Sequence, residues 1–572
     1  MSKGASWLLL LALQASVTSA TPLLRATAKI DAAVVSGVTN GLATKFLGIP
    51  FAKPPARFVA SEAPLPYKGT LNAKAYGPSC PQQKIDSPDT GIAAITQVIN
   101  EAPELHDAIS VESEDCLTLN IIKPTISVPN LIGQPLPVLV WIHGGAYQIG
   151  DTASYDQMGT DLVKRSLALG KPMIYVSINY RQADHSRVSD LFVHHDVLRL
   201  SAYGFLAGTQ IFKEGNGNLG LRDQRLALKW INKYIHAFGG DSSKVTIWGQ
   251  SSGAISVGLQ MMTNGGNTEG LFRAGFMQSG APLPVGNITK GTGQVFYDVL
   301  TQDTGCASAA DSLACLRALP FPVLKASVDK TPSFFSYLSL ALVWHPSVDG
   351  VFLQDNPQAL VRQGKFANVP IVSGTCDDEG TLFGLSSLNV TTDADFRNYI
   401  SSVWLSKNPV SELDALWSYY PADVAQGSPF NTSSSNALTP QFMRVSAFIG
   451  DSVQQGPRRM FLNKAVSQGQ KVWSYLSRRV KDTPGIGSYH GSDLAIGVIN
   501  DNLINFVTSL DPNTNGHGAN ANIHWPQYSA AAPMLYTFPA EANSKPKLTP
   551  DTYRKEAIDY LNGLALAHPF VL

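Results

Sequence analysis

The most informative segment of the chain is Lys244-Val245-Thr246-Ile247-Trp248-Gly249-Gln250-Ser251-Ser252-Gly253, followed by helix-compatible residues 254–262. Residues 245–248 are apolar or β-branched and predict a buried strand, so Ser251 occupies a tight turn between a strand and a helix. Glycines two positions before and after the serine leave room for the close crossing of these two elements. The pattern predicts a nucleophilic hydroxyl projected into a cleft; the structural alternative is a serine in an ordinary glycine turn.

Other apolar runs place this turn in a larger sheet. Runs at 138–142, 173–178 and 371–372 are separated by long segments with helical periodicity, including an amphipathic helix at 223–238. Strands that alternate with helices predict an α/β fold with a large, mostly parallel central sheet flanked by helices. Ligands bind such sheets at the carboxyl ends of the strands, so the turns that follow these runs are candidates for chemistry.

A glycine-rich turn follows the run at 138–142: His143-Gly144-Gly145-Ala146. Acyl transfer develops negative charge on a carbonyl oxygen, which preorganised backbone N–H groups stabilise. Small residues let the backbone approach that oxygen. The expected donors are the N–H groups of Gly145, Ala146 and Ser252; the alternative is a plain turn after a strand.

An acid and a base are expected later in the chain. Asp377, Asp378 and Glu379 follow the run at 371–374, and spacing does not choose among the three carboxylates. Of the eleven histidines, His490 lies in a loop late in the chain, where the order serine, acid, histidine requires the base. A lone loop histidine is otherwise interpreted as a surface residue.

Composition indicates a globular, exported protein. Of the 572 residues, 44% are hydrophobic and 15% charged, and the 43 basic residues balance the 43 acidic ones. This balance argues against nucleic acid or an anionic membrane surface as partners. Residues 1–20 have the charged, apolar and small-residue order of a secretory signal, leaving 21–572 as one extracellular domain. No later run is long enough for a transmembrane helix.

Cysteines and sequons fit this location. The close spacing of Cys306 and Cys315 suggests one loop-stapling disulfide and leaves Cys80 with Cys116 as the long one, with Cys376 unpaired. Glycosylation acceptor triplets occur at three positions: Asn287, Asn389 and Asn431.

The chain closely resembles the type-B carboxylesterase and lipase family of α/β-hydrolases, and within it the secreted fungal lipases. Beyond the turns above, four further motifs carry this resemblance: Lys45-Phe46-Leu47-Gly48-Ile49-Pro50-Phe51, Ser113-Glu114-Asp115-Cys116-Leu117-Thr118-Leu119-Asn120, Asn218-Leu219-Gly220-Leu221-Arg222-Asp223-Gln224 and Leu510-Asp511-Pro512-Asn513. The resemblance implies an α/β-hydrolase fold with a catalytic triad of Ser251, Glu379 and His490. It also implies oxyanion donors at Gly145, Ala146 and Ser252, and the disulfides Cys80 with Cys116 and Cys306 with Cys315.

Residues 80–116 resemble the lid loop of those lipases. Ile92, Ile95, Val98 and Ile99 share one face of an expected short helix, which fits either a mobile lid that meets lipid or ordinary packing. The loop contains no Trp, Tyr or Phe, which argues against binding of choline esters through cation–π contacts.

Several features depart from the family pattern, among them Ser252 where alanine is usual and Ala146 where glycine is common. Gln250 stands where glutamate is usual, which removes one negative charge beside the triad. Residues 182–199 interrupt a familiar segment; their acidic and histidine residues match no metal-site spacing, and we expect a surface loop or a retained intron without assigned function.

The expected activity is hydrolysis of apolar esters, such as acylglycerols or sterol esters, through an acyl-enzyme on Ser251. No metal or organic cofactor is expected, and the partners are a small-molecule or lipid ester and, transiently, a lipid interface. Two alternatives are a catalytically silent binding module of the same fold and a peptidase. The filled triad argues against the first and the lid-like loop against the second.

Overall fold

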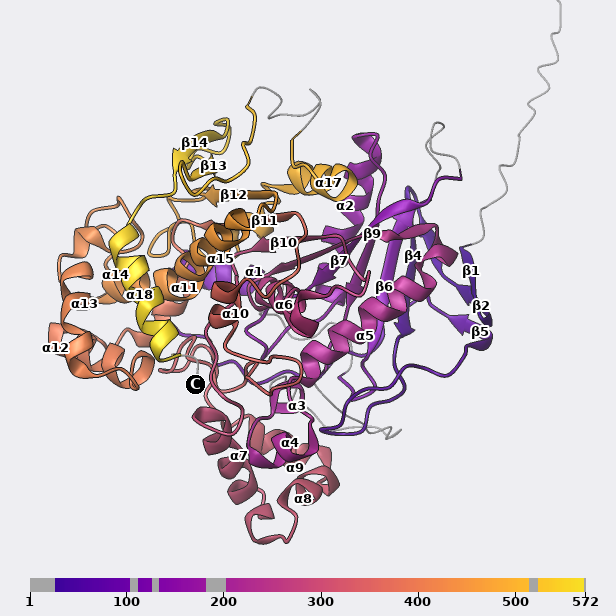
Figure 1. Ribbon diagram of the computed structural model, residues 1–572, viewed down its shortest axis with the longest axis horizontal. Coiled ribbons are helices and arrows are strands. Elements are labelled where there is room, and N and C mark those ends of the chain that lie inside the picture. The colour runs from indigo at the N-terminus through magenta and orange to yellow at the C-terminus, as the bar shows by residue number, and fades with distance from the viewer. Residues whose placement is uncertain (1–25, 103–111, 126–132, 182–201, 514–522, 570–572) are drawn as a thin grey trace, which may run out of the picture.

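The computed structural model describes residues 26–102, 112–125, 133–181, 202–513 and 523–569. The expected signal segment 1–20 and the interrupting segment 182–199 lie outside these residues. Among the described residues, no helix is both long and apolar enough to cross a bilayer. Figure 1 shows a twisted central sheet with helices on both faces.

Within the described residues, eleven strands form the central sheet, in the order β14-β13-β12-β11-β10-β9-β7-β8-β6-β4-β3, and three more form a small sheet, β1-β2-β5. The seven strands from β13 to β8 pair in parallel, and antiparallel strands complete both edges. The strands are β1 (Thr27–Ile30), β2 (Ala32–Ser36), β3 (Val38–Asn40), β4 (Ala43–Pro50), β5 (Lys68–Asn72), β6 (Thr118–Pro124), β7 (Leu136–Ile142), β8 (Ile174–Ile178), β9 (Gly240–Gln250), β10 (Ala274–Gln278), β11 (Ile371–Cys376), β12 (Val472–Ser477), β13 (Met534–Phe538) and β14 (Lys547–Pro550).

Helices α2 and α17 contact one face of the sheet, and α5, α6 and α15 contact elements of the other (Figure 1). The α-helices are α1 (Ala93–Glu101), α2 (Asp156–Ala168), α3 (Ala202–Phe205), α4 (Thr209–Glu214), α5 (Leu219–Tyr234), α6 (Ser252–Gln260), α7 (Thr292–Asp303), α8 (Ser312–Ala318), α9 (Phe321–Val328), α10 (Pro357–Gln363), α11 (Thr381–Gly384), α12 (Asp393–Tyr399), α13 (Asp414–Tyr419), α14 (Phe442–Gly450), α15 (Gly456–Ser467), α16 (Ser492–Ala495), α17 (Asn500–Ser509) and α18 (Lys555–Ala567).

Strand β7 explains why the central runs are continuously apolar. Successive side chains of a strand point to opposite faces of a sheet. Val138, Val140 and Ile142 join one hydrophobic core, whereas Leu139 and Trp141 join the core on the other face. Because helices cover both faces, every one of these positions is buried, as parallel sheets require.

The predicted architecture is confirmed, with boundaries shifted by a few residues. The runs at 138–142, 173–178, 245–248 and 371–372 lie in β7, β8, β9 and β11. The amphipathic segment 223–238 begins earlier than predicted, in α5, and ends in a tighter 3-10 turn at Ile235–Phe238.

Strand register brings the carboxyl ends of the central strands to one edge. Ile142 pairs with Gly249, Gln250 with Gln278, and Gln278 with Gly374. Cys376, at the end of β11, pairs with Ser477 of β12. The turns that carry the predicted chemistry therefore leave the sheet side by side.

The lid-like loop is closed by a disulfide between Cys80 and Cys116, and a second disulfide joins Cys306 and Cys315. Cys376 is a buried free thiol. Inside the first loop lies α1, whose Ile95 and Ile99 are buried in the main core. The predicted apolar face therefore packs against the body of the protein.

The two disulfides should contribute unequally to stability. They close loops with sequence separations of 36 and 9 residues, and a longer crosslinked loop removes more entropy from the unfolded chain. Replacing Cys80 and Cys116 by Ala should lower the free energy of unfolding by about 4 kcal/mol, against about 2.5 kcal/mol for Cys306 and Cys315. Urea denaturation of both double variants measures the difference, and an equal or reversed order would contradict the argument.

Candidate active site

The turn at Ser251 has a backbone that few residues adopt. Ser251 has φ 56° and ψ −127° and its N–H donates to the carbonyl oxygen of Gln278 at 2.9 Å. A Cβ added at Gly253 would lie 2.0 Å from the carbonyl oxygen of Ile142, and one at Gly249 would lie 2.3 Å from the backbone of Gly253. Only glycine fits at both positions. As the sequence suggested, the two glycines leave room for the close crossing of the strand and the helix.

The glycine-rich turn after β7 lies directly against Ser251. A Cβ added at Gly144 would come within 3.0 Å of the Ser251 Cβ. Gly145 and Ala146 both have positive φ, 99° and 55°, and a Cβ at Gly145 would overlap the carbonyl oxygen of Ile149. The Tyr147 N–H donates to the Ser252 Oγ at 3.3 Å, which ties this turn to the start of α6. Ala146 and Ser252 line the same cavity as Ser251, and Gly144 lies against the serine.

The geometry distinguishes the three acids that sequence spacing left open. His490 Nδ1 lies 2.5 Å from Glu379 Oε2, and both side chains are buried. The other Glu379 oxygen accepts a hydrogen bond from the Cys376 N–H at 2.6 Å. Asp377 and Asp378 instead form ion pairs with Lys481. Among the three, only Glu379 contacts the imidazole.

The second imidazole nitrogen faces the serine turn. The Gln250 side-chain amide donates to His490 Nε2 at 3.2 Å, and Gln250 immediately precedes Ser251. With Nδ1–H donating to Glu379, Nε2 carries the lone pair that accepts this bond. The imidazole is thus held between a carboxylate and the residue beside the serine. The ring of Phe383 also packs against it, with the two ring centroids 5.0 Å apart.

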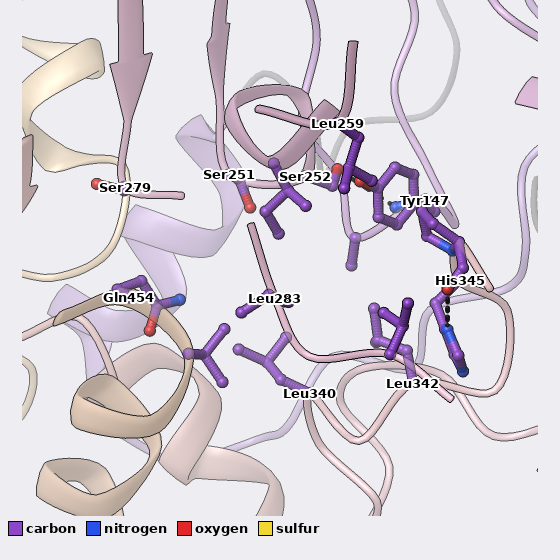
Figure 2. Close-up of a pocket in the computed structure, with 15 residues that line it drawn as sticks. Tyr147, Ser251, Ser252, Leu259, Ser279, Leu283, Leu340, Leu342, His345 and Gln454 are labelled. Atoms are coloured by element: carbon purple, nitrogen blue, oxygen red, sulfur yellow. Dashed lines mark hydrogen bonds between the residues drawn. The ribbon is translucent and has the colours of Figure 1, made fainter. Parts of the chain in front are cut away.

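Two cavities adjoin these residues. The first, drawn in Figure 2, contains Ser251, Ser252 and Ala146, with walls that are mostly aliphatic: Ile255, Leu259, Leu283, Val285, Leu340, Leu342 and Val453. It is narrow, with about 30 Å³ of room for the centres of water molecules, enough for about two waters. The second, larger cavity of about 500 Å³ contains His490 and residues of α1.

A sequence profile of the carboxylesterase family matches residues 26–183 and 197–498. Lipase 4 of Diutina rugosa is 40% identical over 517 residues, which cover 87% of this chain and 88% of that protein. Secreted lipase 1 of Botryotinia fuckeliana is 37% identical, covering 93% and 91% of the two chains. The chain belongs to the carboxylesterase family. It is therefore a carboxylic ester hydrolase of the lipase and esterase type, as the resemblance implied.

The fold of this carboxylesterase also matches a solved structure. The crystal structure of Aspergillus niger EstA superposes with a TM-score of 0.76 at 24% identity, covering 96% of this chain and 99% of that one. This likeness confirms the α/β-hydrolase fold. The family profile does not match residues 184–196 of this chain, which fall within the predicted interruption at 182–199.

Sequence reasoning missed most of the cavity wall of this carboxylesterase. Leu340 and Leu342 come from an irregular loop, and Val453 and Gln454 from a π-helical turn at Asp451–Gln455. Neither segment carries a helix or strand periodicity that points to a binding site. The contact between Gln250 and His490 was also missed; only the unusual residue type at 250 signalled it.

His143, beside the glycine-rich turn, is a buried neutral base. Its Nδ1–H donates to the Gly144 carbonyl at 3.0 Å and its ring stacks on Tyr180 at 4.4 Å. Burial lowers the pKa of the imidazole from 6.5 to about 4. The unfolded chain therefore binds this proton at a higher pH than the folded protein does.

Stability should consequently fall as pH drops from about 6.5 towards 4, and His143 should account for about 3 kcal/mol of that loss. The free energy of unfolding of a His143→Gln variant should depend less on pH across this window. His236→Gln, at an exposed histidine, is the matched control and should keep the wild-type slope. Identical slopes in wild type and His143→Gln would refute the assignment.

Proposed function

We propose that this carboxylesterase hydrolyses apolar esters outside the cell, with Ser251 as nucleophile, His490 as general base and Glu379 as the carboxylate that orients the base. The observation that carries the proposal is the position of the His490 imidazole, with Nδ1 on Glu379 and Nε2 at the residue preceding Ser251. A serine hydroxyl becomes nucleophilic only when a base removes its proton.

In the proposed reaction, His490 Nε2 takes the proton from Ser251 as the hydroxyl attacks the ester carbonyl. The N–H groups of Gly145, Ala146 and Ser252 stabilise the oxyanion that forms. His490 then returns the proton to the departing alcohol, leaving an ester on Ser251. Water repeats the sequence on this acyl-enzyme and releases the acid, with no cofactor required.

The two cavities suggest how the ester lies. The departing alcohol receives its proton from His490, which lines the larger cavity next to α1. The narrow cavity contains Ser251 and two of the proposed oxyanion donors but not His490. We therefore assign the acyl group to the narrow cavity and the alcohol to the larger one.

Aliphatic walls favour an apolar acyl group, because a methylene chain loses unfavourable water contact there. The relatives named lipases support a lipid ester, such as an acylglycerol or a sterol ester, as substrate. The larger cavity includes Val98 and Glu101 of α1. Movement of this helix would widen the alcohol side and offer its apolar face to a lipid interface.

Export is part of the proposal. Residues 1–20 supply the signal pattern, residues 21–572 form the mature single domain, and two disulfides suit an oxidising compartment. The asparagines of the three glycosylation triplets are exposed: Asn287, Asn389 and Asn431. Exposure is what attachment of a glycan requires.

Replacing Ser251 by Ala should reduce kcat on a p-nitrophenyl ester by about 10⁴-fold or more, because the acyl-enzyme cannot form. Secretion and the thermal unfolding midpoint should be retained. Ser418→Ala, at an exposed serine, should leave kcat and labelling by a serine-directed phosphonate unchanged. Full activity of Ser251→Ala would exclude the mechanism, absence of all ester turnover in wild type would favour a binding module, and faster cleavage of a matched amide would favour a peptidase.

Replacing Gln250 by Glu should move the acidic limb of the kcat/KM profile upwards by about one pH unit. A carboxylate 3.2 Å from His490 Nε2 favours the protonated imidazole, which is inactive as a base. Gln250→Met removes the same hydrogen bond without adding charge and should not produce this upward shift. A profile that is unchanged in Gln250→Glu, or shifted equally in both variants, would contradict the proposed contact.

A further inference from the structure

Two residues that line the narrow cavity beside Ser251 each have a buried polar atom without a hydrogen-bond partner in the described part of the chain: Ser279 Oγ and Gln454 Oε1. Their residues are only 1% and 2% exposed. The two other polar rings in the wall are engaged: Tyr147 OH with Ser256 at 3.4 Å, and His345 Nδ1 with the Pro346 carbonyl at 2.7 Å. The unpartnered atoms therefore belong to two buried polar residues in a mostly aliphatic wall.

Gln454 reaches the cavity because of the π-helical turn at Asp451–Gln455, between α14 and α15. Figure 2 shows its side chain on the side of the cavity that faces Leu283, with the amide nitrogen nearer to Leu283 than the amide oxygen is. A π-turn inserts an extra residue into a helix and is frequent at functional sites.

The next residue, Gln455, is also a glutamine, but both polar atoms of its side chain have hydrogen-bond partners. Gln455 Oε1 accepts from Thr375 at 3.0 Å and from Tyr553 at 2.7 Å, and its Nε2 donates to the Cys376 carbonyl at 3.1 Å. The same turn thus sends one glutamine into a satisfied internal network and the next into the cavity with hydrogen-bonding capacity to spare.

Ser279, immediately after β10, also lines the cavity. It has φ 55°, a backbone conformation that favours glycine, and its N–H donates to the Gly374 carbonyl at 2.8 Å. Left-handed backbone at a non-glycine residue persists when the surroundings enforce it, and it concentrates at ligand sites.

We propose that the narrow cavity selects acyl groups that carry a hydroxyl along the chain, with Gln454 as the residue that determines this specificity and Ser279 as a second hydrogen-bonding group. The inference rests on the proposed function, since it takes Ser251 as the attacking group. A hydroxyl both donates and accepts, so it can bond an amide in either orientation.

The preference for a hydroxylated acyl chain depends on whether the polar atoms of the cavity wall keep a hydrogen-bond partner when the chain is bound. An unsubstituted chain fills the cavity, expels water and leaves the Oε1 of the Gln454 amide buried without a partner, which is unfavourable. A hydroxyl at the matching position restores a hydrogen bond to this amide. Sites built to bond a substrate hydroxyl discriminate against the analogue that lacks it far more strongly than aliphatic pockets discriminate chain length.

The test measures kcat/KM for ethyl butanoate and for its 2-hydroxy and 3-hydroxy isomers, whose short chains match the size of the cavity and do not cyclise to lactones. Active sites are counted with a serine-directed phosphonate. In wild type, at least one isomer should exceed the unsubstituted ester by about tenfold. Gln454→Met keeps the side-chain volume and should reduce this ratio to about one. Ser279→Ala should lower the ratio less.

The matched control is Gln363→Met, at an exposed glutamine of α10, which should keep the wild-type ratio. Equal ratios in wild type and Gln454→Met would overturn the inference. If no isomer is preferred in wild type, the inference also fails, regardless of how the variant folds. Absence of turnover of the unsubstituted ester by wild type would instead count against the proposed function.

Discussion

The close crossing of β7, β9 and α6 is the constraint on which the active site depends. At Gly253 the helix passes so near the end of β7 that even a methyl group would overlap the Ile142 carbonyl oxygen. This approach forces Ser251 into a left-handed turn and brings the glycine-rich turn after β7 against it. One steric requirement therefore sets the position of both the serine and the backbone around it.

The parallel sheet extends this local arrangement across the molecule. Because β7, β9, β10 and β11 are paired with their carboxyl ends in line, residues distant in the chain leave the sheet at one edge. Glu379 follows β11, and its carboxylate is held by the Cys376 N–H at the end of that strand. A rigid, fully buried strand thus orients the carboxylate that holds His490.

Sequence patterns predicted the parts of the site that depend on local backbone chemistry. The turn at Ser251 and the glycine-rich turn are encoded by glycines within a few residues, so pattern alone indicated them. The choice of Glu379 over Asp377 and Asp378 was not local, because it depends on Lys481, which is distant in sequence and pairs with both aspartates. Family resemblance supplied that choice. The cavity wall could not be predicted, since a π-turn and an irregular loop leave no periodic signal.

Among the described residues, one carboxylate and one uncharged amide hold the two nitrogens of the His490 imidazole. Gln250 is neutral where the family usually has a carboxylate, and burial raises the pKa of the neighbouring Cys376 thiol. Burial also raises the pKa of Asp493, whose carboxylate is bonded to Tyr475 and Gln278 rather than to His490. Glu379 is then the one carboxylate in direct contact with the imidazole among the described residues. Because Glu379 contacts Nδ1 and the Gln250 amide contacts Nε2, the hydrogen bond from Gln250 affects how the Nε2 side of the ring is stabilised as the proton moves.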